Sequence, residues 1–246
     1  MRDDDTTHFG FSRIPVAEKA RKVAEVFNSV TDRYDLMNDL MSLGTHRIMK
    51  QITVEMVTVR EGYRVLDLAS GTGDLAARLA PAVGDRGQVI MSDINASMLE
   101  AGRDRMLDRG LVLDCVQADA ESLPFADDTF HCVTMAFGLR NVTDKSKALR
   151  AIWRTLRPRG QLVVLEFSKP RHLPVQHAYS LFKRAWPKLG EWVADDADSY
   201  RYLVESIDMH PDQETLEAMF RDAGFVRVRH HDLLDGVAAV HVGQKS

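Results

Sequence analysis

The stretch Arg64-Val65-Leu66-Asp67-Leu68-Ala69-Ser70-Gly71-Thr72-Gly73-Asp74 decides the fold. An apolar, β-rich run ends near Asp67, a loop of small residues follows, and a helical pattern begins at Asp74. A strand–loop–helix unit of this kind presents bare backbone N–H groups at a helix N-terminus to a nucleotide-like ligand. Gly71 and Gly73 suit this loop because a Cβ atom would block the close approach or forbid the turn.

Two further apolar runs along the chain also end in an acidic residue. The run at 88–93 ends in Asp93, twenty positions past Gly73, and the run at 113–119 ends in Asp119. In doubly wound folds an acid at the end of the second strand holds a ribose diol, and ligands bind at the carboxyl edge of the parallel strands. We therefore expect three carboxylates, including that of Asp67, at one edge of one sheet.

Two classes of cofactor compete for such a site. The stretch 71–76 matches the dinucleotide fingerprint in its G-x-G-x-x-A form. Asp67 argues against a dinucleotide, because a carboxylate at the mouth of the site would repel a pyrophosphate. A sulfonium cofactor such as S-adenosylmethionine carries no phosphate and bears positive charge, so acids on this rim favour it. We expect Asp67 in this role rather than as a cap of the loop.

Composition points to one structural domain without metal or nucleic acid. The chain has 246 residues, 45% of them hydrophobic, and a formal net charge of −4. Its nine histidines show no metal-ligand spacing, and Cys115 and Cys132 lie in apolar runs typical of a core. No apolar run is long enough to span a bilayer, and the acidic residues at 3–5 do not resemble a targeting sequence. We expect a cytoplasmic protein from a bacterium.

Hydrophobic periodicity predicts an α/β fold in which strands alternate with helices. The expected strands are 64–69, 88–93, 111–117, 130–136, 161–167, 225–232 and 237–244, and the expected helices are 15–30, 46–57, 74–82, 95–109, 144–157 and 212–223. The Asp235-Gly236 pair predicts a hairpin between the last two strands, so one of them must run antiparallel.

Two segments lie outside this alternation. Residues 1–60 are expected to form an N-terminal helical cap on a core at 61–246, with residues 1–14 mobile apart from docking around Phe9. Residues 170–208 form an insertion in the core, and Pro187 is expected to break or kink a helix there.

Over nearly its whole length the chain resembles class I S-adenosylmethionine-dependent methyltransferases, in its seven-strand pattern and its Asp-x-x-x-Gly-Thr-Gly loop. More narrowly, four segments resemble the ubiquinone/menaquinone biosynthesis C-methyltransferases. They are YDLMNDLMSLGTHR at 34–47, FGLRNVTD at 137–144, LVVLEFSKP at 162–170 and MHPDQETL at 209–216. The resemblance implies a Rossmann-like sheet of seven strands, mostly parallel with one antiparallel strand, together with the helical cap.

The resemblance also implies how S-adenosylmethionine is held. Asp93 would accept hydrogen bonds from both ribose hydroxyls, and Asp119 would face the adenine edge, with a cap of the following turn as its alternative role. Ala136 stands where some relatives have a serine that contacts the cofactor. The implied cofactor-binding residues are Asp67, Gly71, Thr72, Gly73, Asp93, Asp119, Ala120 and Ala136.

The reaction implied by the resemblance is methyl transfer to a ring carbon of a polyprenylated quinol, either 2-methoxy-6-polyprenyl-1,4-benzoquinol or demethylmenaquinol. Arg140, Asn141 and Tyr34 are implied to be catalytic. In this family the arginine is thought to act through a water that the asparagine orients. Because a guanidinium stays protonated, we expect Arg140 to stabilise a quinolate, with a salt bridge to Asp144 as its alternative role.

Further candidates for the substrate side are Asp39 and His46 in the cap and His210, each with a structural role as the alternative. Residues 176–193 mix aromatic with basic side chains, which predicts peripheral membrane contact at the inner face of the membrane or burial against the sheet. A homodimer or a quinone-biosynthesis complex is left open.

Two other functions are weighed against methyl transfer. Tyr179-x-x-x-Lys183 has the spacing of the catalytic pair of NAD(P)-dependent short-chain dehydrogenases, a match that arises easily by chance. The chain could also be a non-catalytic cofactor-binding subunit of a larger assembly. The complete glycine loop and its acids favour an enzyme.

Overall fold

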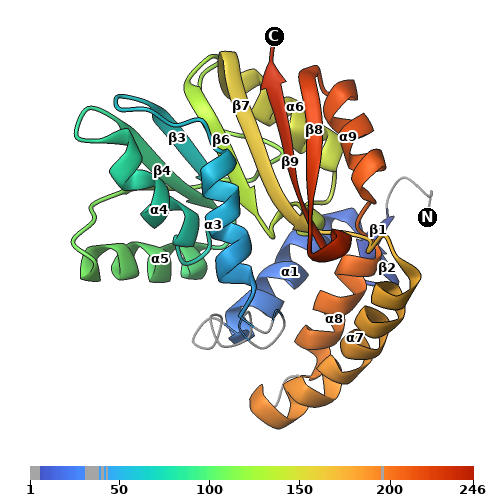
Figure 1. Cartoon of the computed structure of the whole chain (residues 1–246). Helices are drawn as coiled ribbons and strands as arrows, with labels where there is room; N and C mark the ends of the chain where they lie inside the picture. Colours follow the sequence, from blue (N-terminus) through green and yellow to red (C-terminus); the bar gives the residue numbers. More distant parts are fainter. Residues whose placement is uncertain (1–5, 31–38, 40–41, 43, 195–196) are drawn as a thin grey trace.

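A seven-stranded sheet with helices on both faces forms the centre of the molecule (Figure 1). The computed structural model describes residues 6–30, 39, 42, 44–194 and 197–246. The strand order is β5-β4-β3-β6-β7-β9-β8, and only β9 runs antiparallel to its neighbours. The predicted mostly parallel sheet with one antiparallel strand is confirmed. The strands are β3 (Arg64–Leu68), β4 (Gln88–Asp93), β5 (Asp114–Gln117), β6 (Phe130–Ala136), β7 (Leu156–Phe167), β8 (Phe225–Leu233) and β9 (Ala238–Lys245).

Side-chain caps fix where several helices begin. Asn95, Asp144 and Asp212 each accept a hydrogen bond from a backbone N–H in the first turn of the helix that follows. Figure 1 shows α3 and α4 on one face of the sheet and α6 and α9 on the other. The helices are α1 (Val16–Val30), α3 (His46–Met56), α4 (Asp74–Val83), α5 (Ala96–Asp108), α6 (Lys145–Thr155), α7 (Leu173–Ala194), α8 (Ala197–Asp208) and α9 (Gln213–Asp222), with short 3₁₀ turns η3 (Leu139–Asn141) and η4 (Leu234–Gly236).

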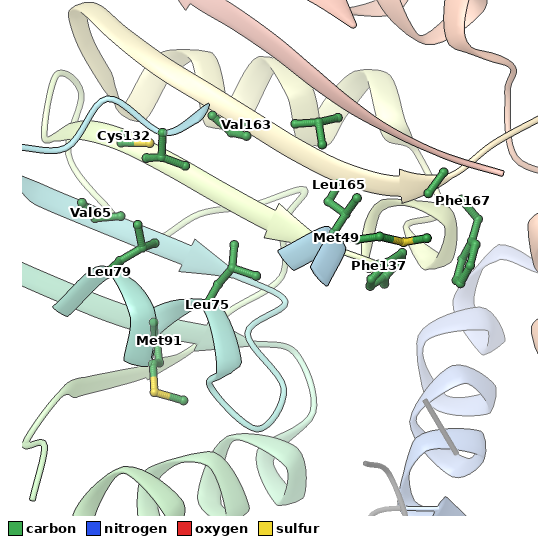
Figure 2. Close-up of a cluster of buried hydrophobic side chains, with 14 of the residues drawn as sticks. Met49, Val65, Leu75, Leu79, Met91, Cys132, Phe137, Val163, Leu165 and Phe167 are labelled. Carbon is green, nitrogen blue, oxygen red and sulfur yellow. The ribbon is translucent and has the colours of Figure 1, made fainter. Parts of the chain in front are cut away.

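The hydrophobic core lies on both faces of the central strands. Val163 and Leu165 of β7 belong to the cluster on one face, and Leu162 and Val164 to the cluster on the other. Strands buried on both faces read as continuous apolar runs, which is why their positions could be predicted. Figure 2 shows Phe137 and Phe167 close together where β6 and β7 end.

Two strand boundaries differ from those expected. β5 begins at Asp114 rather than at 111. β7 begins at Leu156 rather than at 161, because Leu156 pairs with Phe130 before a bulge in the β6–β7 ladder. The hairpin between β8 and β9 is confirmed, and its turn is η4, in which Asp235 has φ of 59°.

An N-terminal hairpin of β1 (Thr6–Phe9) and β2 (Ser12–Pro15) replaces the mobile segment expected at 1–14, so that prediction is wrong for residues 6–14. The predicted docking of Phe9 is confirmed, because its ring stacks on Tyr202 of α8 with the ring centroids 4.2 Å apart. The backbone N–H of Phe11 also donates to Glu205 of the same helix at 3.0 Å. These contacts order a short, mostly polar segment.

The insertion at 170–208 forms the helix pair α7 and α8, which projects beyond the carboxyl edge of the sheet (Figure 1). The expected break at Pro187 is wrong, because α7 continues to Ala194. A proline removes one backbone N–H, and packing of a helix against its neighbour can offset that loss; Trp186 of α7 is fully buried. Within the described ranges, no helix is both long and apolar enough to cross a membrane.

Candidate functional site

A cavity opens at the carboxyl edge of the sheet, at the point where the strand order reverses between β3 and β6. The loop after β3, the ends of β4 and β6 and the turn after β5 all contribute to its wall. This is the position at which open α/β sheets bind their ligands. The predicted site residues that line it are Gly71, Asp93, Asp119, Ala120, Ala136 and Asn141.

Asp93 ends β4 at the floor of this cavity. Its two carboxylate oxygens accept hydrogen bonds from the backbone N–H groups of Gly71 and Asn95, both at 2.9 Å. Burial raises the pKa of Asp93, and these N–H groups act in the opposite direction. The carboxylate therefore joins the glycine loop to the start of α5, and its remaining lone pairs can accept from a ribose diol.

Helix α1 roofs the cavity, at the edge over which the N-terminal helices were expected to lie. Ala20, Ala24 and Phe27 line it from this helix. The side chain of Asn95 donates to Asn28 of α1 at 2.9 Å, which ties the roof to the residues beside Asp93. The apolar helical spacing of residues 16–27 predicted this helix.

The charge of the lining fits a cationic ligand. Asp93, Asp119 and Glu121 are the charged residues in the described lining, which contains no lysine or arginine. A pyrophosphate would meet only like charge here, whereas a sulfonium or ammonium group would be attracted. Asp119 also caps the turn after β5, which was the alternative role predicted for it. Its carboxylate accepts a hydrogen bond from the backbone N–H of Glu121 at 2.9 Å.

Asp67 does not lie at the mouth of the site, so the role expected for it is corrected. One of its carboxylate oxygens accepts from the backbone N–H of Ala76 at 3.1 Å, and the other accepts from Thr134 Oγ1 at 2.8 Å. The side chain is buried beneath the loop, between α4 and the sheet. Asp67 therefore supports the loop from below, the alternative that the sequence reasoning had rejected.

Thr72 is also directed away from the cavity. Its hydroxyl accepts from the guanidinium of Arg105 on α5 at 2.9 Å. Gly73 adopts φ of 80°, a left-handed conformation that favours glycine. Of the three loop residues predicted to cradle the cofactor, Gly71 is the one that lines the cavity.

The assignment of Asp67 as a buried support of the loop can be tested by varying the pH. Burial raises the pKa of Asp67 to about 7, against about 3.9 in an unfolded chain. Because the folded state holds this proton more tightly, ionisation lowers the free energy of unfolding between these two pKa values, by at most about 1.4 kcal/mol per pH unit. We expect the wild type to lose stability relative to Asp67→Asn between about pH 4 and pH 7 in urea unfolding. A difference that is constant over this range would contradict the assignment.

Arg140 forms a buried ion pair with Glu166, at 2.9 Å between Nη1 and Oε1. The backbone N–H of Arg140 donates to the other oxygen of Glu166 at 3.1 Å, and Nη1 also donates to the carbonyl of Phe137. The salt bridge to Asp144, proposed as the alternative role for Arg140, is therefore wrong, since Asp144 caps α6 instead. Sequence reasoning missed Glu166, although it lies in one of the four segments of resemblance.

Asn141 directly follows Arg140 in η3. It lines the cavity, and its side-chain oxygen accepts from the hydroxyl of Tyr202 at 3.0 Å. Tyr34, the third residue expected to be catalytic, lies outside the described residues. His46 is buried and bonded to Ser42 Oγ at 2.9 Å, and Asp39 pairs with Arg47, so both hold the cap together.

Known proteins provide an independent comparison. The model of the ubiE/COQ5 methyltransferase family matches residues 16–245. The chain is 56% identical to "Ubiquinone/menaquinone biosynthesis C-methyltransferase UbiE" of Cellvibrio japonicus (strain Ueda107) over 248 residues, covering 100% of both chains. It is 53% identical to the protein of the same name from Teredinibacter turnerae over 249 residues, again with 100% of both covered.

Solved structures confirm the fold. A methyltransferase from Thermotoga maritima, described as a possible histamine N-methyltransferase, superposes with a TM-score of 0.65 at 18% identity, covering 90% of this chain and 99% of that one. A methyltransferase from Aquifex aeolicus gives 0.59 at 17% identity, covering 85% and 98%.

The short-chain dehydrogenase alternative has no support in these comparisons. Lys183 pairs with Asp208 of α8 and lies over the ring of Tyr179, so the Tyr–Lys spacing reflects two neighbours on one helix. Identity over the full length, the matched family model and the shared fold lead to one assignment: the chain belongs to the ubiE/COQ5 methyltransferase family.

Proposed function

We propose that this protein transfers the methyl group of S-adenosylmethionine to a ring carbon of a polyprenylated quinol. The observation that carries the proposal is that the lining of the acidic cavity includes Asn141, which directly follows Arg140 of the buried Arg140–Glu166 pair. The relatives compared above are named as C-methyltransferases of ubiquinone/menaquinone biosynthesis. The acceptor is a benzoquinol, a naphthoquinol or both.

The residues around the cavity suit the cofactor. Asp93 would accept from the ribose hydroxyls, Asp119 and Ala120 would lie at the adenine, and the acids of the lining would attract the cationic methionine part. When bound, S-adenosylmethionine supplies an electrophilic methyl group on a sulfonium. Ala69 and Phe137, the residues directly after β3 and β6, line this space with φ of 52° and 56°. Such left-handed backbone at non-glycine residues is typical of ligand sites.

Methylation of a ring carbon requires an electron-rich ring. Loss of a hydroxyl proton to solvent would leave an electron pair on the oxygen, and the ring carbon would then form the new C–C bond as the methyl C–S bond breaks with its pair on sulfur. Loss of the ring proton to solvent would restore aromaticity. The guanidinium of Arg140 would stabilise the oxygen anion, since it stays protonated and is held in place by Glu166.

A prenyl tail must leave the site across an apolar surface. Leu173 and Leu181 of α7 are both about two-thirds exposed, at 67% and 66%. We infer from them that the exposed side of α7 takes part in peripheral membrane contact. Trp186 and Phe182, both on α7, pack edge to face with each other and belong to the hydrophobic core, so part of the aromatic segment serves the core instead.

The test is a methylation assay with reduced short-tail quinols. We expect S-adenosylmethionine to bind in the micromolar range by calorimetry, NADPH not to bind, and a benzoquinol or a naphthoquinol lacking the ring methyl to gain the mass of one methylene. Cofactor binding without any methylated product from either quinol would support the non-catalytic subunit instead. Binding of NADPH alone would overturn the proposal.

A further inference from the structure

The buried polar atoms without hydrogen-bond partners include atoms of Arg140 and of two residues on which its charge acts, Tyr179 and His210. In the part of the chain that the structure describes, nine buried side-chain nitrogen or oxygen atoms lack a partner. Four of them belong to three residues: Nε of Arg140, the hydroxyl of Tyr179 and both ring nitrogens of His210. Leaving such a group unsatisfied destabilises a fold by roughly 1–3 kcal/mol, so this set of atoms calls for an explanation.

The three residues come from separate elements that meet at the carboxyl edge. Arg140 lies in η3, Tyr179 in α7, and His210 between α8 and α9. Asp208 joins the last two, since it pairs with Lys183 of α7 and lies two residues before His210. Lys169, just after β7, donates to the backbone carbonyl of Asp208 at 2.7 Å and so fixes this junction to the sheet.

Tyr179 and His210 are both uncharged in the folded protein. Burial is the main cause that raises the pKa of Tyr179, which stays a phenol and a hydrogen-bond donor. Burial, together with the cations of Lys145, Arg140 and Lys169 and with His241, holds the pKa of His210 well below its ordinary value. His210 is therefore a neutral imidazole with one donor and one acceptor nitrogen.

We propose that Tyr179 and His210, together with Nε of Arg140, form the hydrogen-bonding site for the hydroxyl oxygens of the aromatic substrate; the inference rests on the proposed function. Arg140 and Tyr179 offer two donors, which is what an oxygen anion requires. His210 offers a donor and an acceptor, which is what a neutral hydroxyl requires. A hydroquinone that has lost one proton presents both kinds of oxygen on one ring.

This role predicts an unusual combination of effects. Tyr179→Phe and His210→Leu each remove a polar group that has no protein partner, so both variants are expected to melt about 2–4 °C above the wild type. Each is also expected to weaken binding of a short-tail benzoquinol about 10-fold or more, measured anaerobically by calorimetry with S-adenosylhomocysteine present. The affinity for S-adenosylhomocysteine should change less than about twofold.

Two tyrosines serve as matched controls. Tyr202→Phe removes a buried hydroxyl that donates to Asn141, so this variant should melt below the wild type. Tyr63→Phe, whose ring stacks on His131 at the amino end of the sheet, should leave quinol binding unchanged. If the wild type binds quinol and the Tyr179 and His210 variants bind it equally well, this inference alone is overturned. It is also overturned if both variants have a lower melting temperature than the wild type. If the wild type binds no quinol, the proposed function fails with it.

Discussion

Replacing Asp93 by asparagine is expected to weaken binding of S-adenosylmethionine by about 100-fold or more. A hydrogen bond to a charged group contributes about 1.5–3 kcal/mol, and the proposed ribose contact makes two of them. An amide has only one acceptor oxygen, so it can neither serve both ribose hydroxyls nor accept from both Gly71 and Asn95 as the carboxylate does. Calorimetric titration of the purified variant measures this loss directly.

Asp114→Asn is the matched control for this prediction. Asp114 is also an acidic residue of the same sheet, but it lies exposed at the start of β5 and bonds to the side chain of Gln88 at 2.6 Å. We expect the Asp114→Asn variant to bind S-adenosylmethionine with the affinity of the wild type. Urea unfolding of both variants measures their stability. It therefore shows whether weaker cofactor binding comes from a lost contact with the ligand or from a destabilised loop. Binding by a folded Asp93→Asn protein within about threefold of the wild type would rule out the assigned role.

The sequence was sufficient to predict the sheet and its ligand-binding edge, because both depend on local patterns. Continuous apolar runs mark strands buried on two faces, and an acid at the last position of such a run or just after it lies at the carboxyl edge, as Asp93 and Asp119 do. Asp67 was misassigned because it lies one residue before the end of β3, opposite Thr134 in the ladder. The direction of its side chain depends on a neighbouring strand.

Contacts between distant segments could not be predicted. Arg140 and Glu166 are 26 residues apart and meet only because β6 and β7 pair in a register that sets Ala136 beside Leu165. Asp144 was the nearer acid in sequence and therefore the wrong partner to choose. The β1–β2 hairpin is likewise held by the stacking of Phe9 on Tyr202, a residue far along the chain. Local patterns carry no information about such pairings.

Replacing Arg140 by methionine is expected to lower kcat about 100- to 1,000-fold, the effect of losing one donor to a developing oxygen anion. The same change should lower the free energy of unfolding by about 3–5 kcal/mol, because it leaves the buried carboxylate of Glu166 without its charge partner. A loss of activity in this variant alone would therefore be ambiguous between chemistry and folding.

The double variant Arg140→Met with Glu166→Gln resolves the ambiguity. It removes both buried charges and keeps an amide oxygen that can accept from one of the two backbone N–H groups, Arg140 and Phe167, which Glu166 now serves. We expect it to regain at least about half of the lost stability, because a neutral replacement of a buried ion pair is far less costly than an unpaired charge. Activity should stay as low as in the single variant. If kcat recovers together with stability, Arg140 holds the fold and takes no part in the chemistry.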